Sequence, residues 1–174
     1  MKTLLLLRHG KSSWDDASLA DIDRPLAPRG IAAASRMGRE IARRGWLPDR
    51  ALVSSSARTR ATWELACTEL GPEPETSFSP TLYEAAAEAL LTEIRQTPDR
   101  IGTLILVGHN PGMADLVLSL AGAGSAPAAI DSASSKFPTA ALARLSFDGA
   151  WEALGHRTAR LTHVLRPKDL GDEK

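Results

Sequence analysis

Three short runs of almost entirely apolar residues recur along the chain, at residues 4–7, 51–53 and 103–107. None of them alternates apolar and polar positions, as a strand with one solvent-facing side does. A strand that is covered on both faces needs apolar side chains in both directions. The three runs therefore predict buried parallel strands in a sheet that has helices on both faces.

Between these runs the apolar positions recur at helical spacing. In residues 31–43, one side of a helix would carry Ile31, Ala34, Met37 and Ile41. Further helices are predicted over residues 58–70, 85–96 and 113–121. Strands that alternate with helices predict an α/β fold, a three-layer αβα sandwich with a mostly parallel central sheet and right-handed crossovers.

The last third of the chain has a different pattern. Residues 140–147 and 151–165 are strand-like, and the Asp148-Gly149 dipeptide between them is typical of a two-residue hairpin turn. We expect this hairpin to add antiparallel strands at one edge of the sheet. The stretch 122–135 is rich in Gly, Ala and Ser, and we expect a loop there. From the chain length we expect a single domain over residues 1–174.

Charge and cysteine content narrow the range of functions. Lys and Arg together number 21, as do Asp and Glu, so the net charge is zero. This balance disfavours a broad electrostatic contact with nucleic acid but leaves room for a local cationic pocket. Cys67 is the only cysteine, which excludes a disulfide within the chain and a zinc site built of cysteines. The apolar run at 4–7 is too short for a signal peptide or a membrane span, so we expect a cytoplasmic protein.

Polar residues follow directly after each predicted strand. Arg8-His9-Gly10 follows the first, a serine-rich segment that leads to Arg58 follows the second, and Gly108-His109-Asn110-Pro111 follows the third. In open α/β sheets, ligands bind beyond the carboxyl ends of the strands. Two arginines and two histidines at this edge suit a phosphoryl group, because guanidinium groups match pairs of phosphate oxygens and a histidine can donate a hydrogen bond or attack.

In this order the motifs resemble those of the histidine phosphatase superfamily, whose type member is phosphoglycerate mutase. The resemblance rests on RHG after the first strand, on a serine-to-arginine segment after the second, and on GHNP after a later one. It spans nearly the whole chain. The branch that it looks most like is that of the short SixA-type phosphohistidine phosphatases, on the motifs RHGKSSW, DIDRPLAPRG, SSSARTRAT, LYEA, GHNPG and VLRPKDL.

The resemblance implies roles for five residues. His9 would be the nucleophile that takes the phosphoryl group, and the phosphate oxygens would be held by Arg8, Arg58 and His109. Glu84 matches the position of the family's proton donor, which protonates the leaving group and then activates water. Neither a metal nor another cofactor is implied, because the arginines neutralise the phosphate charge.

Elementary electrostatics agrees with a nucleophilic His9. Only a neutral imidazole can attack phosphorus, and two nearby guanidinium groups would lower the pKa of His9. We expect a backbone carbonyl to hold the ring in one tautomer. In the same region Ser54 to Ser56 offer an N-cap for a helix that starts near Ala57.

Other polar residues compete with these candidates. Arg60 is two positions from Arg58, but the spacing from the serines favours Arg58. Asp21, Asp23 and Arg24 surround a turn, for which a local salt bridge is favoured slightly over a contact with the substrate.

Two departures from the mutase pattern bear on the substrate. Asp15 stands where mutases typically have Asn, and Lys11 where they have an acidic or polar residue. We expect Asp15 to point away from phosphate or to pair with Lys11. The segment from Arg58 to Glu84 is short, whereas mutases and acid phosphatases of the superfamily insert a longer capping segment near there. An open, shallow site suits a phosphorylated protein better than a buried sugar phosphate.

We therefore expect a metal-independent phosphatase that acts through a phosphohistidine intermediate, with protein phosphohistidine as the substrate. The first alternative is a small-molecule phosphomonoesterase with the same site. The second is a phosphate-binding module without turnover, although such a module needs neither the nucleophile His9 nor the acid Glu84. A metal-dependent phosphatase fits least, because no carboxylate cluster follows the strands.

Overall fold

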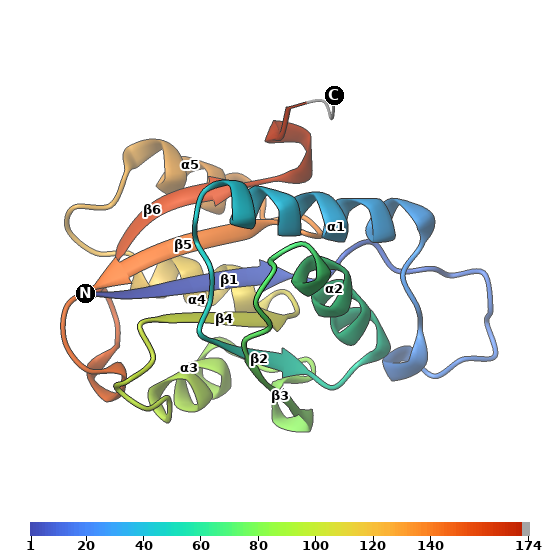
Figure 1. Ribbon diagram of the computed structural model, residues 1–174, viewed down its shortest axis with the longest axis horizontal. Coiled ribbons are helices and arrows are strands. Elements are labelled where there is room, and N and C mark those ends of the chain that lie inside the picture. Colours follow the sequence, from blue (N-terminus) through green and yellow to red (C-terminus); the bar gives the residue numbers. More distant parts are fainter. Residues whose placement is uncertain (172–174) are drawn as a thin grey trace.

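Six strands form one sheet in the computed structural model, which describes residues 1–171 (Figure 1). Their order across the sheet is β3-β2-β4-β1-β5-β6. Their bounds are β1 Lys2–Arg8, β2 Arg50–Ser54, β3 Glu75–Ser79, β4 Thr103–Gly108, β5 Leu142–Phe147 and β6 Arg160–Leu165. β1 to β4 are parallel, whereas β5 is antiparallel to both of its neighbours, β1 and β6. The predicted α/β class, with a mostly parallel sheet and an antiparallel edge, is confirmed.

Helices cover both faces of this sheet (Figure 1). One face carries α1 Pro28–Arg43 and α2 Ala57–Thr68, and the other carries α3 Ala87–Arg95, α4 Gly112–Leu120 and α5 Pro127–Ser135. Short 3-10 turns form at η1 Asp21–Asp23, η2 Pro80–Leu82, η3 Trp151–Ala153 and η4 Pro167–Asp169. Within residues 1–171, no helix has the length and apolar content needed to cross a membrane.

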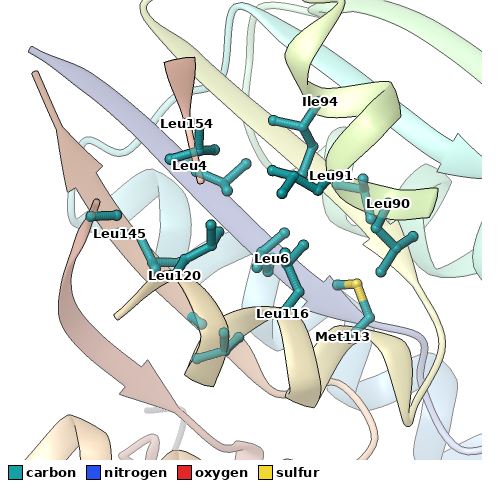
Figure 2. Close-up of a cluster of buried hydrophobic side chains, with 14 of the residues drawn as sticks. Leu4, Leu6, Leu90, Leu91, Ile94, Met113, Leu116, Leu120, Leu145 and Leu154 are labelled. Atoms are coloured by element: carbon teal, nitrogen blue, oxygen red, sulfur yellow. The ribbon is translucent and has the colours of Figure 1, made fainter. Parts of the chain in front are cut away.

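The leucines of β1 link the two halves of the core. Leu5 and Leu7 pack with buried side chains of α1 and α2, whereas Leu4 and Leu6 pack with those of α3 and α4 (Figure 2). All four are fully buried. Because successive strand side chains point to opposite faces, one apolar run fills both cores, and each leucine contributes roughly 2 kcal/mol of transfer free energy.

Two elements differ from the sequence prediction. The strand β3 was not expected, because its residues ETSFS are mostly polar; it lies at the edge of the sheet beside β2, where apolar residues are not needed on both faces. The loop expected over 122–135 is wrong for Pro127–Ser135, which form α5. Small residues suffice there, since Ala129 and Ala133 bury their methyl groups against the core.

The strands of the antiparallel edge are not joined by a two-residue turn. Gly149 has a φ of 107°, but the chain then continues through η3, and β6 begins only at Arg160. Trp151 holds this longer connection in place: its ring is fully buried, and its Nε1 donates to the carbonyl oxygen of Ile101 at 2.8 Å. Burial of this large side chain with a satisfied N–H outweighs the preference of Asp-Gly for a tight turn.

The C-terminal ends of five strands lie at one edge of the sheet. The parallel strands β1, β2, β3 and β4 all end there. β6 ends at the same edge, because Leu165 pairs with Leu142, which in turn pairs with Leu7 near the end of β1. The loops that follow these five strands therefore lie along the same edge of the sheet.

Candidate active site

His9 and His109 leave adjacent strands at the same level. Arg8 pairs with Gly108 at the ends of β1 and β4, so the residue that follows each of them lies beside the other. The two imidazole centroids are 5.3 Å apart. The structure thus brings together the first and third post-strand segments that the sequence singled out.

The ring of His9 is buried and held in one orientation. Its Nδ1 lies 2.7 Å from the carbonyl oxygen of Gly10, so Nδ1 carries the proton and Nε2 is left with a free lone pair. Burial lowers the pKa of His9 to about 4, and the charges of Arg58 and Arg8 act in the same direction. The expected effect of the two guanidinium groups is present, but desolvation is the larger cause. At neutral pH the ring is a neutral imidazole.

His109 is oriented by the end of β2. Ser54 is fully buried, and its Oγ lies 2.8 Å from Nε2 of His109. The other nitrogen, Nδ1, faces Arg58 Nη2 at 3.5 Å and a carboxylate oxygen of Glu84 at 3.9 Å. Burial, followed by the neighbouring His9, lowers the pKa of His109 to about 3. Ser54 was considered only as part of a helix cap in the sequence, yet it contacts a candidate site residue.

Arg58 stands in the first turn of α2 and points into the site. Ser56 caps this helix by accepting from the main-chain N–H of Thr59, as the serine-rich segment indicated. The guanidinium is buried, and its Nη2 donates to Glu84 Oε1 at 2.9 Å. Arg60 points elsewhere: its Nε donates to the carbonyl of Ser55, and its side chain is exposed. The preference for Arg58 over Arg60 agrees with this placement.

Arg8 is the last residue of β1 and directly precedes His9. Its Nη1 donates to the carbonyl oxygen of Phe137 at 3.2 Å, an oxygen that also accepts from the side chain of Asn110. The buried Nε of Arg8 has no hydrogen-bond partner within the described part of the chain. Burial, followed by the charge of Arg58, lowers the pKa of Arg8. A buried donor beside a second guanidinium is an arrangement that an anion would stabilise.

Glu84 completes the group of predicted site residues. Its side chain is half exposed, and its backbone has a φ of 52°, in the left-handed region that non-glycine residues seldom adopt. The next residue is tightly held, because a Cβ on Gly112 would lie 2.0 Å from the carbonyl oxygen of Ala85. Glycine at position 112 therefore allows the start of α4 to approach the backbone that carries Glu84.

Asp21 and Tyr83 also belong to this cluster. The Asp21 carboxylate accepts a hydrogen bond from Arg58 Nη2 at 3.0 Å. The same carboxylate accepts a second hydrogen bond from the Tyr83 hydroxyl. The hydrogen bond from Tyr83 is the largest cause that lowers the pKa of Asp21 to about 2. The favoured salt bridge between Asp21 and Arg24 is present as well, at 3.1 Å. The sequence offered one signal for Asp21, its place in the DIDRPLAPRG motif.

Two further sequence expectations concern the rim and metal binding. Lys11 and Asp15 are exposed, and no ion pair joins them among the described residues. The main-chain N–H of Asp15 bonds to the hydroxyl of Ser13 instead. In residues 1–171, no group of three or more His, Cys, Asp or Glu side chains is arranged to hold a metal ion.

Comparison with known proteins adds independent information. The sequence model of the histidine phosphatase superfamily (branch 1) matches residues 4–114. An uncharacterized protein of Mycobacterium leprae (strain TN) is 34% identical over 92% of this chain and 100% of its own length.

Two solved structures share the fold over nearly the whole chain, and both are described as candidate phosphohistidine phosphatases SixA. The one from Nakamurella multipartitia is 30% identical, with a TM-score of 0.82 over 95% of this chain and 96% of its own. The one from Agrobacterium tumefaciens is 29% identical, with a TM-score of 0.80 over 95% of this chain and 98% of its own. From the family match and these similarities, the chain belongs to the histidine phosphatase superfamily, branch 1.

Proposed function

We propose that this chain is a metal-independent phosphatase that uses His9 as its nucleophile, with phosphohistidine on a protein as its substrate. Membership of the histidine phosphatase superfamily supports the phosphatase class. The observation that carries the mechanism is the orientation of His9. Its Nδ1–H is bonded to the carbonyl of Gly10, which leaves the Nε2 lone pair of a neutral ring free to attack.

In the first step, Nε2 of His9 attacks phosphorus, and the bond from phosphorus to the leaving atom breaks. Arg8 and Arg58 bind the phosphoryl oxygens and stabilise their charge in the transition state. The carboxyl group of Glu84 gives its proton to the leaving atom. His109 donates from Nδ1 to a phosphoryl oxygen, a tautomer that requires the hydroxyl of Ser54 to donate to Nε2.

In the second step, the Glu84 carboxylate takes a proton from a water molecule, and the water oxygen attacks the phosphorus of phospho-His9. The bond between phosphorus and Nε2 breaks, orthophosphate leaves, and the lone pair of His9 is restored. Glu84 again carries the proton that the next turnover needs. Each step forms one bond to phosphorus and breaks one, so no further reactant is required.

Two observations support a large substrate. Between Arg58 and Glu84 the chain forms only the remainder of α2, the edge strand β3 and the turn η2, with no inserted capping segment. The side chains of Glu84 and Asp21 are 52% and 48% exposed, so the rim of the site is open to solvent. The similarity to the two candidate SixA structures favours phosphohistidine over other phosphorylated groups.

The test is orthophosphate release from a phosphohistidine peptide and from an aryl phosphate, in excess chelator, by the parent protein, His9→Ala and His156→Ala. The exposed His156 provides a matched control for the loss of an imidazole. We expect the parent and His156→Ala to be active and His9→Ala to be inactive. Turnover by His9→Ala would exclude His9 as the nucleophile. Aryl phosphate hydrolysis alone would favour a small-molecule phosphomonoesterase, and stoichiometric phosphate binding without release would favour a binding module.

A further inference from the structure

A cavity of about 350 Å³ lies between α1, the segment before β5 and the segment after β6. Five basic residues contribute to its lining: Lys11, Arg29, Arg36, Arg166 and Lys168. The described residues that line it include no Asp or Glu. In a chain whose net charge is zero, this is a local concentration of positive charge that the overall composition does not suggest. A concave surface of one sign attracts groups of opposite charge.

The cavity lies at the same edge of the sheet as the candidate active site. Lys11 is two residues after His9, and Arg166 directly follows β6, which ends at this edge. Thr139 also lines the cavity, and the next residue, Ala140, donates its main-chain N–H to the carbonyl oxygen of His9 at 2.9 Å. The turn after β1 therefore contributes to both sites, through His9 to the candidate active site and through Lys11 to the cavity.

The basic residues divide into two groups. Arg36 and Arg166 have partners: Arg36 donates to the carbonyl oxygens of Leu170 and Gly171, and Arg166 pairs with Asp169 at 2.8 Å. These contacts fix the wall of the cavity. Lys11 and Arg29 have exposed side chains, and neither makes a side-chain hydrogen bond or ion pair with any described residue. Together with the exposed Lys168, they are the groups that can meet a ligand.

We propose that this basic pocket binds an acidic segment of the phosphoprotein substrate. This proposal rests on the proposed function, and it names the part of the phosphoprotein that the enzyme would recognise outside the catalytic site. A small phosphate ester at His9 does not extend around the turn that carries Gly10 and Lys11, whereas a polypeptide can. Glutamate and aspartate side chains on such a polypeptide would form charge-assisted hydrogen bonds with Lys11, Arg29 and Lys168.

The loop beside the active site supports a protein as the occupant. Trp14, Leu19 and Ile22 lie between β1 and α1, and they are three of the large apolar side chains that the chain leaves exposed. Exposed apolar side chains gathered on one loop are typical of surfaces that contact another protein. Because Asp21 of the same loop contacts Arg58, a peptide bound at the active site would lie beside this loop.

The test compares two phosphohistidine peptides, one with four flanking glutamates and one with four flanking glutamines. At low salt we expect kcat/KM to be about tenfold higher for the glutamate peptide, the size that a few exposed charge pairs allow. The double variant Arg29→Glu/Lys168→Glu should lose this preference. Its hydrolysis of an aryl phosphate, which occupies only the catalytic site, should be unchanged. The preference should also fall as salt is raised, because exposed charges are screened.

The matched control is Arg100→Glu/Arg157→Glu. This double variant changes the net charge by the same amount. Arg100 and Arg157 are exposed and lie before the first residues of β4 and β6, at the end of the sheet opposite to the active site. This control should keep the preference for the glutamate peptide. An equal loss in both double variants would overturn the proposal, because it would show a response to net charge alone.

A binding measurement separates failure of the pocket from failure of the proposed function. A fluorescent glutamate peptide without the phosphoryl group is titrated into the parent and into Arg29→Glu/Lys168→Glu. Salt-sensitive binding to the parent that is about tenfold weaker in the variant supports the pocket, even if no phosphohistidine is hydrolysed. Equal binding to both proteins, or none to the parent, overturns it, even if the phosphatase activity is present. Binding of inorganic pyrophosphate in place of the peptide would also overturn it, in favour of a small anion.

Discussion

Arg58 and Asp21 are 37 positions apart in the sequence and are joined by two hydrogen bonds. Nη1 of Arg58 donates to the main-chain carbonyl of Asp21 at 2.8 Å, and Nη2 donates to its carboxylate at 3.0 Å. Arg58 lies in the first turn of α2, whereas Asp21 belongs to the η1 turn between β1 and α1. The contact therefore attaches an exposed loop to the candidate active site. The Asp21 carboxylate also reduces the positive charge that an incoming phosphate would meet.

Replacement of Asp21 should change phosphate binding and turnover in opposite directions. In Asp21→Asn the guanidinium of Arg58 loses a competing negative charge, so orthophosphate should inhibit about tenfold more strongly. The value of kcat should fall, because Arg58 is less firmly oriented. Inhibition constants for orthophosphate, measured beside kcat, check both effects. Asp23→Asn is the control on the same turn, and equal inhibition constants in Asp21→Asn and the parent would contradict the prediction.

The two buried histidines should make the fold sensitive to mild acid. Burial lowers the pKa of His9 from 6.5 to about 4 and that of His109 to about 3, so protonation favours the unfolded chain. Stability should be highest above pH 6.5 and should fall as the pH drops toward 4, by roughly 2–3 kcal/mol per histidine at pH 4.5. The pKa of Asp21 is about 2, so its ion pairs persist through this range.

Urea unfolding at pH 7 and at pH 4.5 measures this effect. His9→Gln, whose amide takes up no proton, should lose less stability between these two pH values than the parent. His156→Gln, at an exposed position, should behave like the parent. The same loss of stability in His9→Gln and in the parent would show that His9 is not responsible.

Ser54 should matter through His109. In Ser54→Ala the buried Nε2 of His109 loses its partner at 2.8 Å, which should reduce stability by about 1–3 kcal/mol. If His109 must donate from Nδ1 to the phosphoryl group, kcat/KM should also fall about tenfold, since the required tautomer is no longer held. Ser55→Ala, at a half-buried neighbour, is the control. A Ser54→Ala protein that is less stable but fully active would leave Ser54 with a structural role only.

The acid Glu84 should be needed to different extents by different substrates. An alkoxide leaving group needs a proton, whereas the imidazole of phosphohistidine is already a fair leaving group. Glu84→Gln should therefore slow hydrolysis of alkyl or aryl esters more than hydrolysis of phosphohistidine. The ratio of kcat/KM values for the two substrates, in the variant and in the parent, is the measurement. Equal losses on both substrates would contradict this order.

The sequence predicts those strands of the fold that are buried on both faces, because their residues must nearly all be apolar. The apolar run at residues 4–7 predicts a central strand, and the end of that strand places Arg8 and His9 at the sheet edge. The sequence does not predict the strand β3 or the helix α5. An edge strand tolerates polar residues, and small residues suffice for a lightly packed helix, so neither element has a clear hydrophobic pattern. The pattern of residues within β3 or α5 does not indicate which other elements each one packs against.

The residues of the candidate site likewise include some that the sequence predicts and some that it does not. His9, Arg58 and His109 each follow a buried strand, so topology alone brings them together. Asp21 reaches the site only through a loop whose path depends on contacts outside its own segment. One of these is the hydrogen bond from Arg58 Nη1 in α2 to the main-chain carbonyl of Asp21, at 2.8 Å. A loop held by such long-range contacts has no periodic signature, which is why the sequence alone slightly favours a local salt bridge of Asp21 over a contact with the substrate.

The tight contact between Gly30 and Lys11 yields a further prediction. A Cβ at position 30, in the first turn of α1, would lie 2.2 Å from the carbonyl oxygen of Lys11, in the turn that follows His9. By helix propensity alone, Gly30→Ala should stabilise α1 by about 1 kcal/mol. Because main-chain atoms cannot move aside as a flexible side chain does, we expect the opposite sign, a loss of about 1–3 kcal/mol.

The same variant tests how the catalytic turn is held. Displacing Lys11 would shift Gly10, whose carbonyl fixes the tautomer of His9, so kcat should fall together with stability. Gly102→Ala is the matched control, since its added Cβ would meet only a side-chain oxygen of Asp49 at 3.4 Å, an ordinary contact. Urea unfolding and aryl phosphate turnover, measured on both variants, separate the two effects. A Gly30→Ala protein that is more stable than the parent and fully active would mean that the start of α1 does not constrain His9.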